Sequence, residues 1–196
     1  MHRITAVALV AGVLLASGCA QAPQEEIENA NQALEAARSA EAPEYAPEAW
    51  QLSQDAFDSA MTEIQAQNER FVLVRSYDEA SQLLDKATQA ANAAATEAQS
   101  ARDETKLRAE ALLQEAEAAV AAASTAIETA PKGKGTEADL MAMKAELEAM
   151  TTSLAMARES FAAGKYLVAE STAQSVRDQA NAIAADISQA RTKRAT

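Results

Sequence analysis

Small and apolar residues recur along residues 77–130 in alternating steps of four and three, with polar residues between them. This spacing is the heptad pattern of a helix that packs along one side. The segment holds neither proline nor glycine, so it predicts a single helix of roughly 80 Å at about 1.5 Å per residue. The recurring positions are Ala80, Leu84, Ala87, Ala91, Ala94, Ala98 and Ala101, followed later by Leu112, Ala116, Ala119, Ala123, Ala126 and Ala130.

The heptad pattern is interrupted between Ala101 and Ala109. Thr105 lies between them, so two steps of four follow each other in the most charged part of the segment, Arg102 to Arg108. An extra step of four is a stutter, which locally unwinds a supercoil. We interpret it as one helix that changes partner: its first half packs on the preceding helix and its second half on the two C-terminal helices. The alternative is a short kink or break.

Shorter apolar stripes on both sides of the long segment predict four further helices. Strand-like residues are confined to Phe71–Val74, a short and isolated run. The predicted fold class is therefore all-α, an elongated antiparallel helical bundle or coiled coil with one long central helix. In chain order, the four further helices cover residues 25–40, 47–72, 137–163 and 166–190, and the basic residues 191–196 are expected to fray.

The helix pairs on the two sides of the loop at 131–136 match each other without a gap at an offset of 89 residues. Residues 137–196 are therefore predicted to repeat residues 48–102, with coincidence among alanine-rich helices as the alternative. The shared elements are Ala60-Met61-Thr62 with Ala149-Met150-Thr151, Tyr77-x-x-Ala80 with Tyr166-x-x-Ala169, and Ala101-Arg102 with Ala190-Arg191.

A tyrosine follows the turn in each predicted repeat, Tyr77 in the first and Tyr166 in the second. At this place a ring can pack between two helices while its hydroxyl stays in water. We therefore predict structural roles for both tyrosines, and stacking on a ligand is the alternative. Gly164 is expected to end the helix before Tyr166, since glycine is favoured just beyond a helix C-terminus.

The candidate chemistry of the chain is limited by its residue types. It has one cysteine, Cys19, and one histidine, His2, and both lie in or at the edge of an N-terminal apolar segment. Without that segment there is no Ser–His or Cys–His pair and no histidine metal ligand. Glu115 and Glu117 fall off the heptad positions, where solvent is expected. The sequence therefore predicts no enzyme, cofactor, metal site or small-molecule substrate.

The chain is acidic, with 17 basic and 29 acidic residues and a net charge of −12. Removal of residues 1–18 takes away Arg3 and leaves 16 basic against 29 acidic residues, a sum of −13. Nucleic acids and anionic lipid surfaces are repelled by such a charge. A basic protein, a cationic peptide or divalent cations would be attracted, but a solvated acidic surface is the simpler interpretation.

The N-terminus begins with His2 and Arg3 and continues with an apolar run that is too short to span a bilayer, 4–15. The run ends in Leu15-Ala16-Ser17-Gly18-Cys19, which resembles the lipobox of bacterial lipoproteins, although leucine is commoner than alanine at Ala16. The resemblance implies cleavage before Cys19, lipid on its sulfur and an acylated amine. Because Ala20 is not aspartate, it also implies the outer membrane. An ordinary secretory leader is the alternative.

A second resemblance concerns the turns. Tyr45-Ala46-Pro47, Tyr77-x-x-Ala80 and Gly164-Lys165-Tyr166-x-x-Ala169 resemble an uncharacterised alanine-rich helical-hairpin module of Gram-negative envelope lipoproteins. This module has no assigned activity. The resemblance therefore implies a location and a shape, and it implies no chemistry.

These observations predict a lipoprotein signal peptide at 1–18, a lipidated tether at 19–24, an N-terminal helical hairpin with the long helix at 25–130, the loop at 131–136 and a C-terminal hairpin at 137–196. The expected function is a lipid-anchored periplasmic structural or interaction protein on the outer membrane, a coiled-coil spacer or adaptor. Its partners would be the membrane and an envelope protein or a second copy, with no nucleic acid. The alternative is a binding module whose acidic helices hold the cationic partners named above.

Overall fold

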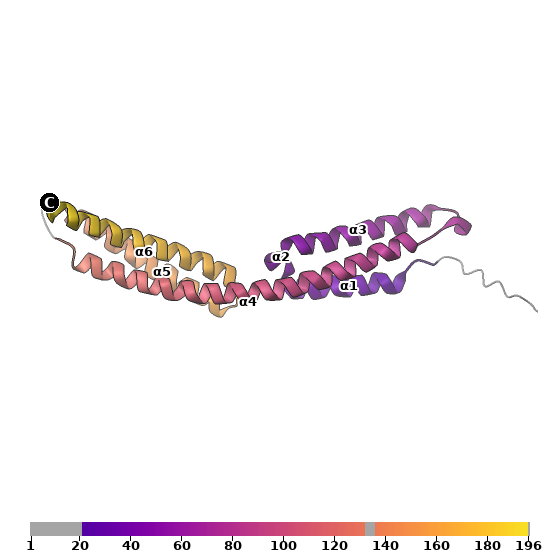
Figure 1. Cartoon of the computed structure of the whole chain (residues 1–196), viewed down its shortest axis with the longest axis horizontal. Coiled ribbons are helices and arrows are strands. Elements are labelled where there is room, and N and C mark those ends of the chain that lie inside the picture. Colours follow the sequence, from indigo (N-terminus) through magenta and orange to yellow (C-terminus); the bar gives the residue numbers. More distant parts are fainter. Residues whose placement is uncertain (1–20, 132–135, 196) are drawn as a thin grey trace, which may run out of the picture. The chain divides into compact units, whose positions relative to one another are not determined.

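The structure is a computed structural model, which describes residues 21–131 and 136–195. Within these residues there is no β-strand, and the predicted all-α fold class with one long central helix is confirmed. The signal peptide, Cys19 and most of the predicted loop lie outside the described residues. The elements are α1 (Gln24–Ser39), α2 (Ala42–Tyr45), α3 (Pro47–Glu69), the short 3-10 helix η1 (Val72–Val74), α4 (Asp78–Glu128), α5 (Glu137–Ala162) and α6 (Tyr166–Ala195) (Figure 1).

The helices form two compact units, and the first combines α1 and α3 with residues 78–94 of α4. In this N-terminal unit α1 and α4 run in the same direction and α3 runs in the opposite one (Figure 1). Alanine lines much of the contact, which lets the helix backbones approach closely. The buried core consists of Ala30, Ala60, Ile64, Tyr77, Ala80, Leu84 and Ala87.

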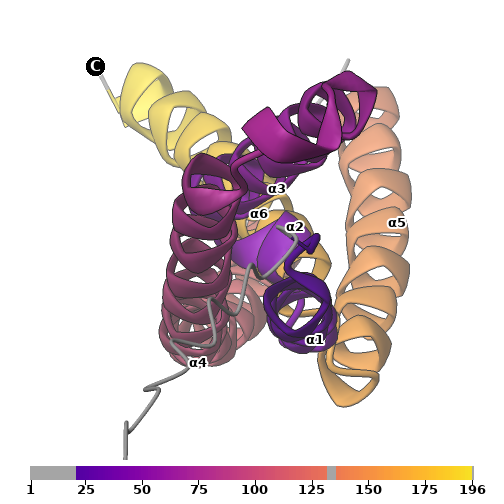
Figure 2. The same ribbon diagram turned by 90° about the vertical axis from the view of Figure 1, so that its right-hand side faces the viewer.

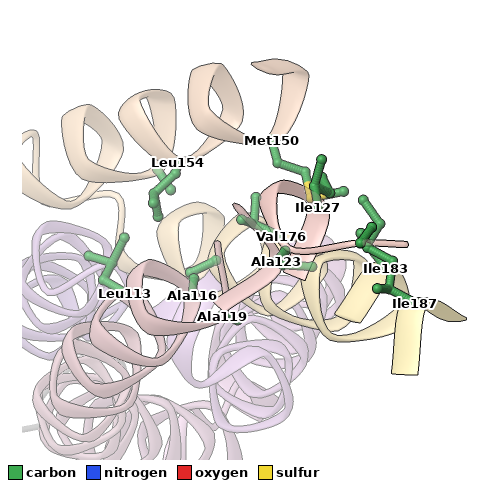
Figure 3. Packing of buried hydrophobic residues seen from close by; sticks show 14 residues of the cluster. Leu113, Ala116, Ala119, Ala123, Ile127, Met150, Leu154, Val176, Ile183 and Ile187 are labelled. Atoms are coloured by element: carbon green, nitrogen blue, oxygen red, sulfur yellow. The ribbon is translucent and has the colours of Figure 1, made fainter. Parts of the chain in front are cut away.

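The C-terminal unit combines α2, residues 95–128 of α4, α5 and α6. The division between the units thus falls inside α4, whereas the sequence places a domain boundary at the loop that follows it. Figure 3 shows larger side chains here, including Met150, Leu154 and Ile183, gathered between the helices. The buried core comprises Leu113, Ala116, Ala119, Ala123, Ile127, Ala130, Met150, Leu154, Ala157, Ala173, Val176, Ala180, Ile183 and Ile187.

Helix α4 is continuous through the stutter, as the first interpretation predicts. Thr105 is buried at the stutter. Its hydroxyl donates to the carbonyl of Ala101 at 2.7 Å and accepts from Nη2 of Arg108 at 2.8 Å. A buried polar group is tolerated when its hydrogen bonds are made, so the helix continues through the charged segment without a break.

After the stutter, the predicted core positions of α4 are wrong by one residue at two places. Leu113 and Ile127 are buried, whereas the predicted Leu112 and Ala126 are half-buried. Both places carry two neighbouring apolar residues, so the pattern alone left the choice open. The direction from which α5 and α6 approach α4 decides it.

Two segments expected to be irregular are helical. The break between the first two predicted helices contains one helical turn, α2, with Pro43 in its first turn. The C-terminal residues expected to fray continue α6 to Ala195. Arg191 explains the second difference, because its guanidinium donates to the hydroxyl of Thr129 and, at 3.5 Å, to the carbonyl of Ala126.

Burial refines the register of the predicted repeat. Six buried positions of α4 match buried positions of α6 at the predicted offset of 89 residues. In α3 and α5, however, Ala60, Ile64 and Gln67 correspond to Met150, Leu154 and Ala157, an offset of 90. The first repeat therefore has one residue more than the second between the matched positions of its two helices. The six matched pairs are Ala80–Ala169, Leu84–Ala173, Ala87–Val176, Ala91–Ala180, Ala94–Ile183 and Ala98–Ile187.

The core of the N-terminal unit predicts a clear difference between two leucines. Leu84 is 0% exposed and Leu52 is 66% exposed. Leu84→Ala should lower the free energy of unfolding by about 2–5 kcal/mol, because it removes buried methyl groups and leaves a cavity. Leu52→Ala should change it by less than about 0.5 kcal/mol. Urea unfolding followed by circular dichroism measures both, and equal effects would contradict the assigned core.

Candidate functional site

Arg102, on α4, joins three segments of the C-terminal unit. Its Nε donates to Oε2 of Glu41 at 2.7 Å. Its Cζ lies 4.9 Å from the centre of the Tyr166 ring, a distance at which a guanidinium is attracted to the face of an aromatic ring. Its Nη2 also lies 3.4 Å from the place where a Cβ on Gly164 would be. We call Arg102, Glu41, Tyr45, Gly164 and Tyr166 the arginine cluster.

Glu41 brings the short helix α2 to the arginine cluster. Its backbone is left-handed, with φ 61° and ψ 30°. The carbonyl of Glu41 accepts from the amides of Glu44 and Tyr45 at 3.0 and 3.1 Å, which starts the turn of α2. A left-handed backbone is uncommon for a residue other than glycine. At Glu41 it occurs together with the hydrogen bond from Arg102 to the side-chain carboxylate.

Tyr45 carries the other end of α2 to the same place. Its hydroxyl lies near the backbone of Tyr166. Burial raises the pKa of the Tyr45 hydroxyl, the neighbouring Glu41 carboxylate raises it further, and Arg102 opposes the shift. The hydroxyl therefore stays protonated at neutral pH and serves as a neutral hydrogen-bonding group.

Gly164 ends α5 in the left-handed conformation, with φ 78°. Its amide donates to the carbonyl of Phe161 at 3.0 Å, and the amide of Lys165 donates to that of Ser160 at 2.9 Å. This pair of bonds is the Schellman motif, which needs the left-handed residue that glycine supplies at low cost. The sequence placed Gly164 at this helix end for the same reason.

Tyr166 begins α6 with its ring between two neighbours. One neighbour is the Phe161 ring, whose centroid lies 5.2 Å from that of Tyr166 with the two planes inclined by 58°. The other neighbour is the Arg102 guanidinium. The hydrogen bond with Glu41 raises the pKa of the Arg102 guanidinium, so it stays charged. Its charge is met by the carboxylate and the ring, and the arrangement holds helices together rather than offering a cation to a ligand.

Tyr77 is placed differently from its counterpart. It is buried in the core of the N-terminal unit, and its hydroxyl donates to Oδ1 of Asn68 on α3 at 2.6 Å. The α3–α4 turn before Tyr77 is closed by hydrogen bonds of side chains, whereas the α5–α6 turn is closed by the left-handed backbone of Gly164. Oε1 of Gln67 accepts from the amide of Ser76 at 3.1 Å, and Arg75 donates to the carbonyls of Arg70 and Asn68 at 2.8 and 2.7 Å.

Arginine–carboxylate pairs also connect the helices of the C-terminal unit, and the sequence analysis missed them. Glu115 and Glu117 were expected to face solvent. Instead, Glu115 bonds Arg177 on α6, and Glu117 bonds Arg158 on α5. The two α4–α6 pairs join residues 62 apart, which requires the parallel register of these helices. The pairs are Arg108–Glu170 at 2.7 Å, Arg177–Glu115 at 2.8 Å and Arg158–Glu117.

An exposed apolar turn is the most unusual surface of the N-terminal unit. Phe71, Val72, Leu73 and Val74 are 69, 40, 81 and 64% exposed, and we call them the apolar tip. The sequence singled them out as the chain's one strand-like run, but Val72–Val74 form η1 instead. The signal that could have found the tip is four consecutive apolar residues between two arginines at a turn.

Residues 21–131 and 136–195 show neither a membrane-spanning helix nor a metal centre. No helix in this part of the chain is long and apolar enough to cross a membrane, and no group of three or more His, Cys, Asp or Glu side chains is arranged there to hold a metal ion. No protein-family model, curated protein or solved structure matches the chain.

The arginine cluster predicts an energetic coupling between Arg102 and Glu41. In a double-mutant cycle with Arg102→Gln and Glu41→Gln, the coupling should be about 0.5–1 kcal/mol, since both side chains are partly exposed to water. Chemical unfolding followed by circular dichroism measures it. The matched control pairs Glu41→Gln with Arg177→Gln, whose effects should add because Arg177 bonds Glu115 instead. Zero coupling in the first cycle would show that the ion pair contributes nothing.

Proposed function

We propose that this protein is a lipid-anchored periplasmic spacer or adaptor of the bacterial envelope, held on the outer membrane by Cys19. The observation that carries the proposal is the lipobox-like Leu15-Ala16-Ser17-Gly18-Cys19 directly before a helical unit. Helix α1 begins at Gln24, five residues after the cysteine. An anchor so close to a folded unit fixes that unit near the bilayer.

The charges of the described helices support a positional role. Arginines of the C-terminal unit are engaged with carboxylates of neighbouring helices, and these bonds hold α4, α5 and α6 together. The acidic side chains that remain on the surface keep alanine-rich helices soluble. An adaptor of this kind acts by holding a partner, an envelope protein or a second copy, at a set place relative to the membrane.

The anchor is tested by two matched substitutions in the full chain, expressed in a Gram-negative host. Cys19→Ala should abolish lipid attachment, since the sulfur that carries the lipid is gone, and should move the protein out of the membrane fraction. Ser17→Ala keeps a small residue at its position and should leave lipidation unchanged. Mass spectrometry of the N-terminal peptide and sedimentation on a sucrose gradient give the two readouts. Wild-type protein without lipid would overturn the proposal.

The adaptor role predicts a specific contact that depends on the anchor. Photo-crosslinking residues at Leu107 and Met156 should capture a defined partner, because both side chains are exposed, at 67% and 60%, and a crosslinker there leaves the core intact. Arg177 and Glu117 are poor positions, since each bonds another helix. The same variants carrying Cys19→Ala should lose the adduct. An adduct that persists without the anchor would contradict an adaptor that works at the membrane.

A further inference from the structure

The turn that carries the apolar tip is closed by hydrogen bonds. Arg75 bonds the carbonyls of Arg70 and Asn68, and the amide of Val74 donates to the carbonyl of Phe71 at 2.9 Å. The core of α3 ends with the buried Gln67, and that of α4 begins with Tyr77. The four apolar side chains between them therefore project past the end of the helices, and their exposure is built into the fold.

The position of the tip relative to the N-terminus is defined by α1. Residues 21–26 line an open groove together with Tyr77, which directly precedes α4, and with Asp78 and Ser81 of the first turn of α4. The α3–α4 turn leads directly into that turn of α4. The start of α1 and the apolar tip thus lie at the same end of the N-terminal unit, the end at the right in Figure 1 and nearest the viewer in Figure 2.

Chain length then limits how far Cys19 is from this end. Only Ala20 separates Cys19 from Gln21, the first described residue. At no more than about 3.6 Å per residue, the Cα atoms of Cys19 and Gln21 are at most about 7 Å apart. A lipid on Cys19 would enter the bilayer beside the end of the unit that carries the exposed tip.

We propose that the apolar tip inserts into the phospholipid interface next to the lipid on Cys19, as a second membrane contact. This inference rests on the proposed lipid anchor. The anchor fixes one point of the unit, and the tip fixes a second point, which sets the unit's orientation. Apolar side chains flanked by arginines suit the boundary between acyl chains and headgroups, where the apolar atoms are buried and the charged groups stay wet.

A second copy of the chain fits the tip less well. A stable dimer interface takes about 800 Å² from each partner, and four side chains of one convex turn do not supply it. The charge of this end also restricts the kind of lipid. Glu25, Glu26, Asp78 and Glu79 lie in the first turns of α1 and α4, so a zwitterionic surface is favoured over an anionic one.

The test uses tryptophan as a probe of membrane depth. Full-length chains carrying Leu73→Trp, or Val74→Trp as a second tip variant, are expressed in cells, purified after processing and reconstituted into phosphatidylcholine vesicles with brominated acyl chains. The tip tryptophan should shift its emission to the blue and lose most of its intensity, since bromine quenches only fluorophores that reach the acyl chains. Leu52→Trp is the matched control, because Leu52 is an exposed leucine of the same unit near the opposite end of α3.

The native Trp50, the chain's one tryptophan, is common to all variants, and its signal is subtracted with the unsubstituted protein. Mass spectrometry of each sample records the lipid on Cys19. A lipidated chain whose tip tryptophans behave like the one at position 52 would overturn the tip insertion and leave the anchor intact. A chain without lipid would overturn the anchor and the insertion with it. A blue shift without quenching would show that another protein surface covers the tip and would also overturn the inference.

Discussion

Alanine lines much of the contact between helices in both units, and the other contacts of the protein have to compensate for its small size. At the contact positions of α4, side chains such as Ala80, Ala87 and Ala116 are fully buried, yet each removes little apolar area from water. Close packing restores part of this loss through many short van der Waals contacts.

Alanine buries little apolar area and does not fix the register of the helices. The larger core residues supply the first, and the arginine–carboxylate pairs supply the second. In the C-terminal unit, Leu154, Val176 and Ile183 fill the space between helices (Figure 3). Outside this core, Arg108 and Arg177 bond carboxylates across the α4–α6 contact. Exposed pairs of this kind contribute little stability each, but their fixed geometry selects one parallel register among several that alanine would permit.

The two turns between paired helices show how similar elements acquire different surfaces. The α5–α6 turn is closed by Gly164 in a Schellman motif and is covered by Arg102 and the ring of Tyr166. The α3–α4 turn is longer, covering residues 70–77 where the α5–α6 turn covers only 163–165, and it is closed by the side chains of Gln67 and Arg75. Its four apolar residues are left in solvent. The apolar tip is thus a consequence of turn length and turn chemistry, and the proposed insertion uses a surface that the shorter turn does not offer.

Local patterns in the chain predict the all-helical class, the long α4 and the helix end at Gly164, because heptad spacing, the absence of proline and glycine, and glycine's left-handed backbone act locally. They also predict that α4 continues through Thr105. The packing of α5 and α6 against α4, in contrast, decided that Leu113 and Ile127 are buried in place of their neighbours. Tertiary packing likewise decided that Arg102 meets Glu41 and Tyr166 and that the tip is exposed. These outcomes depend on the direction and register in which separate helices meet, and no local pattern in the chain encodes either one.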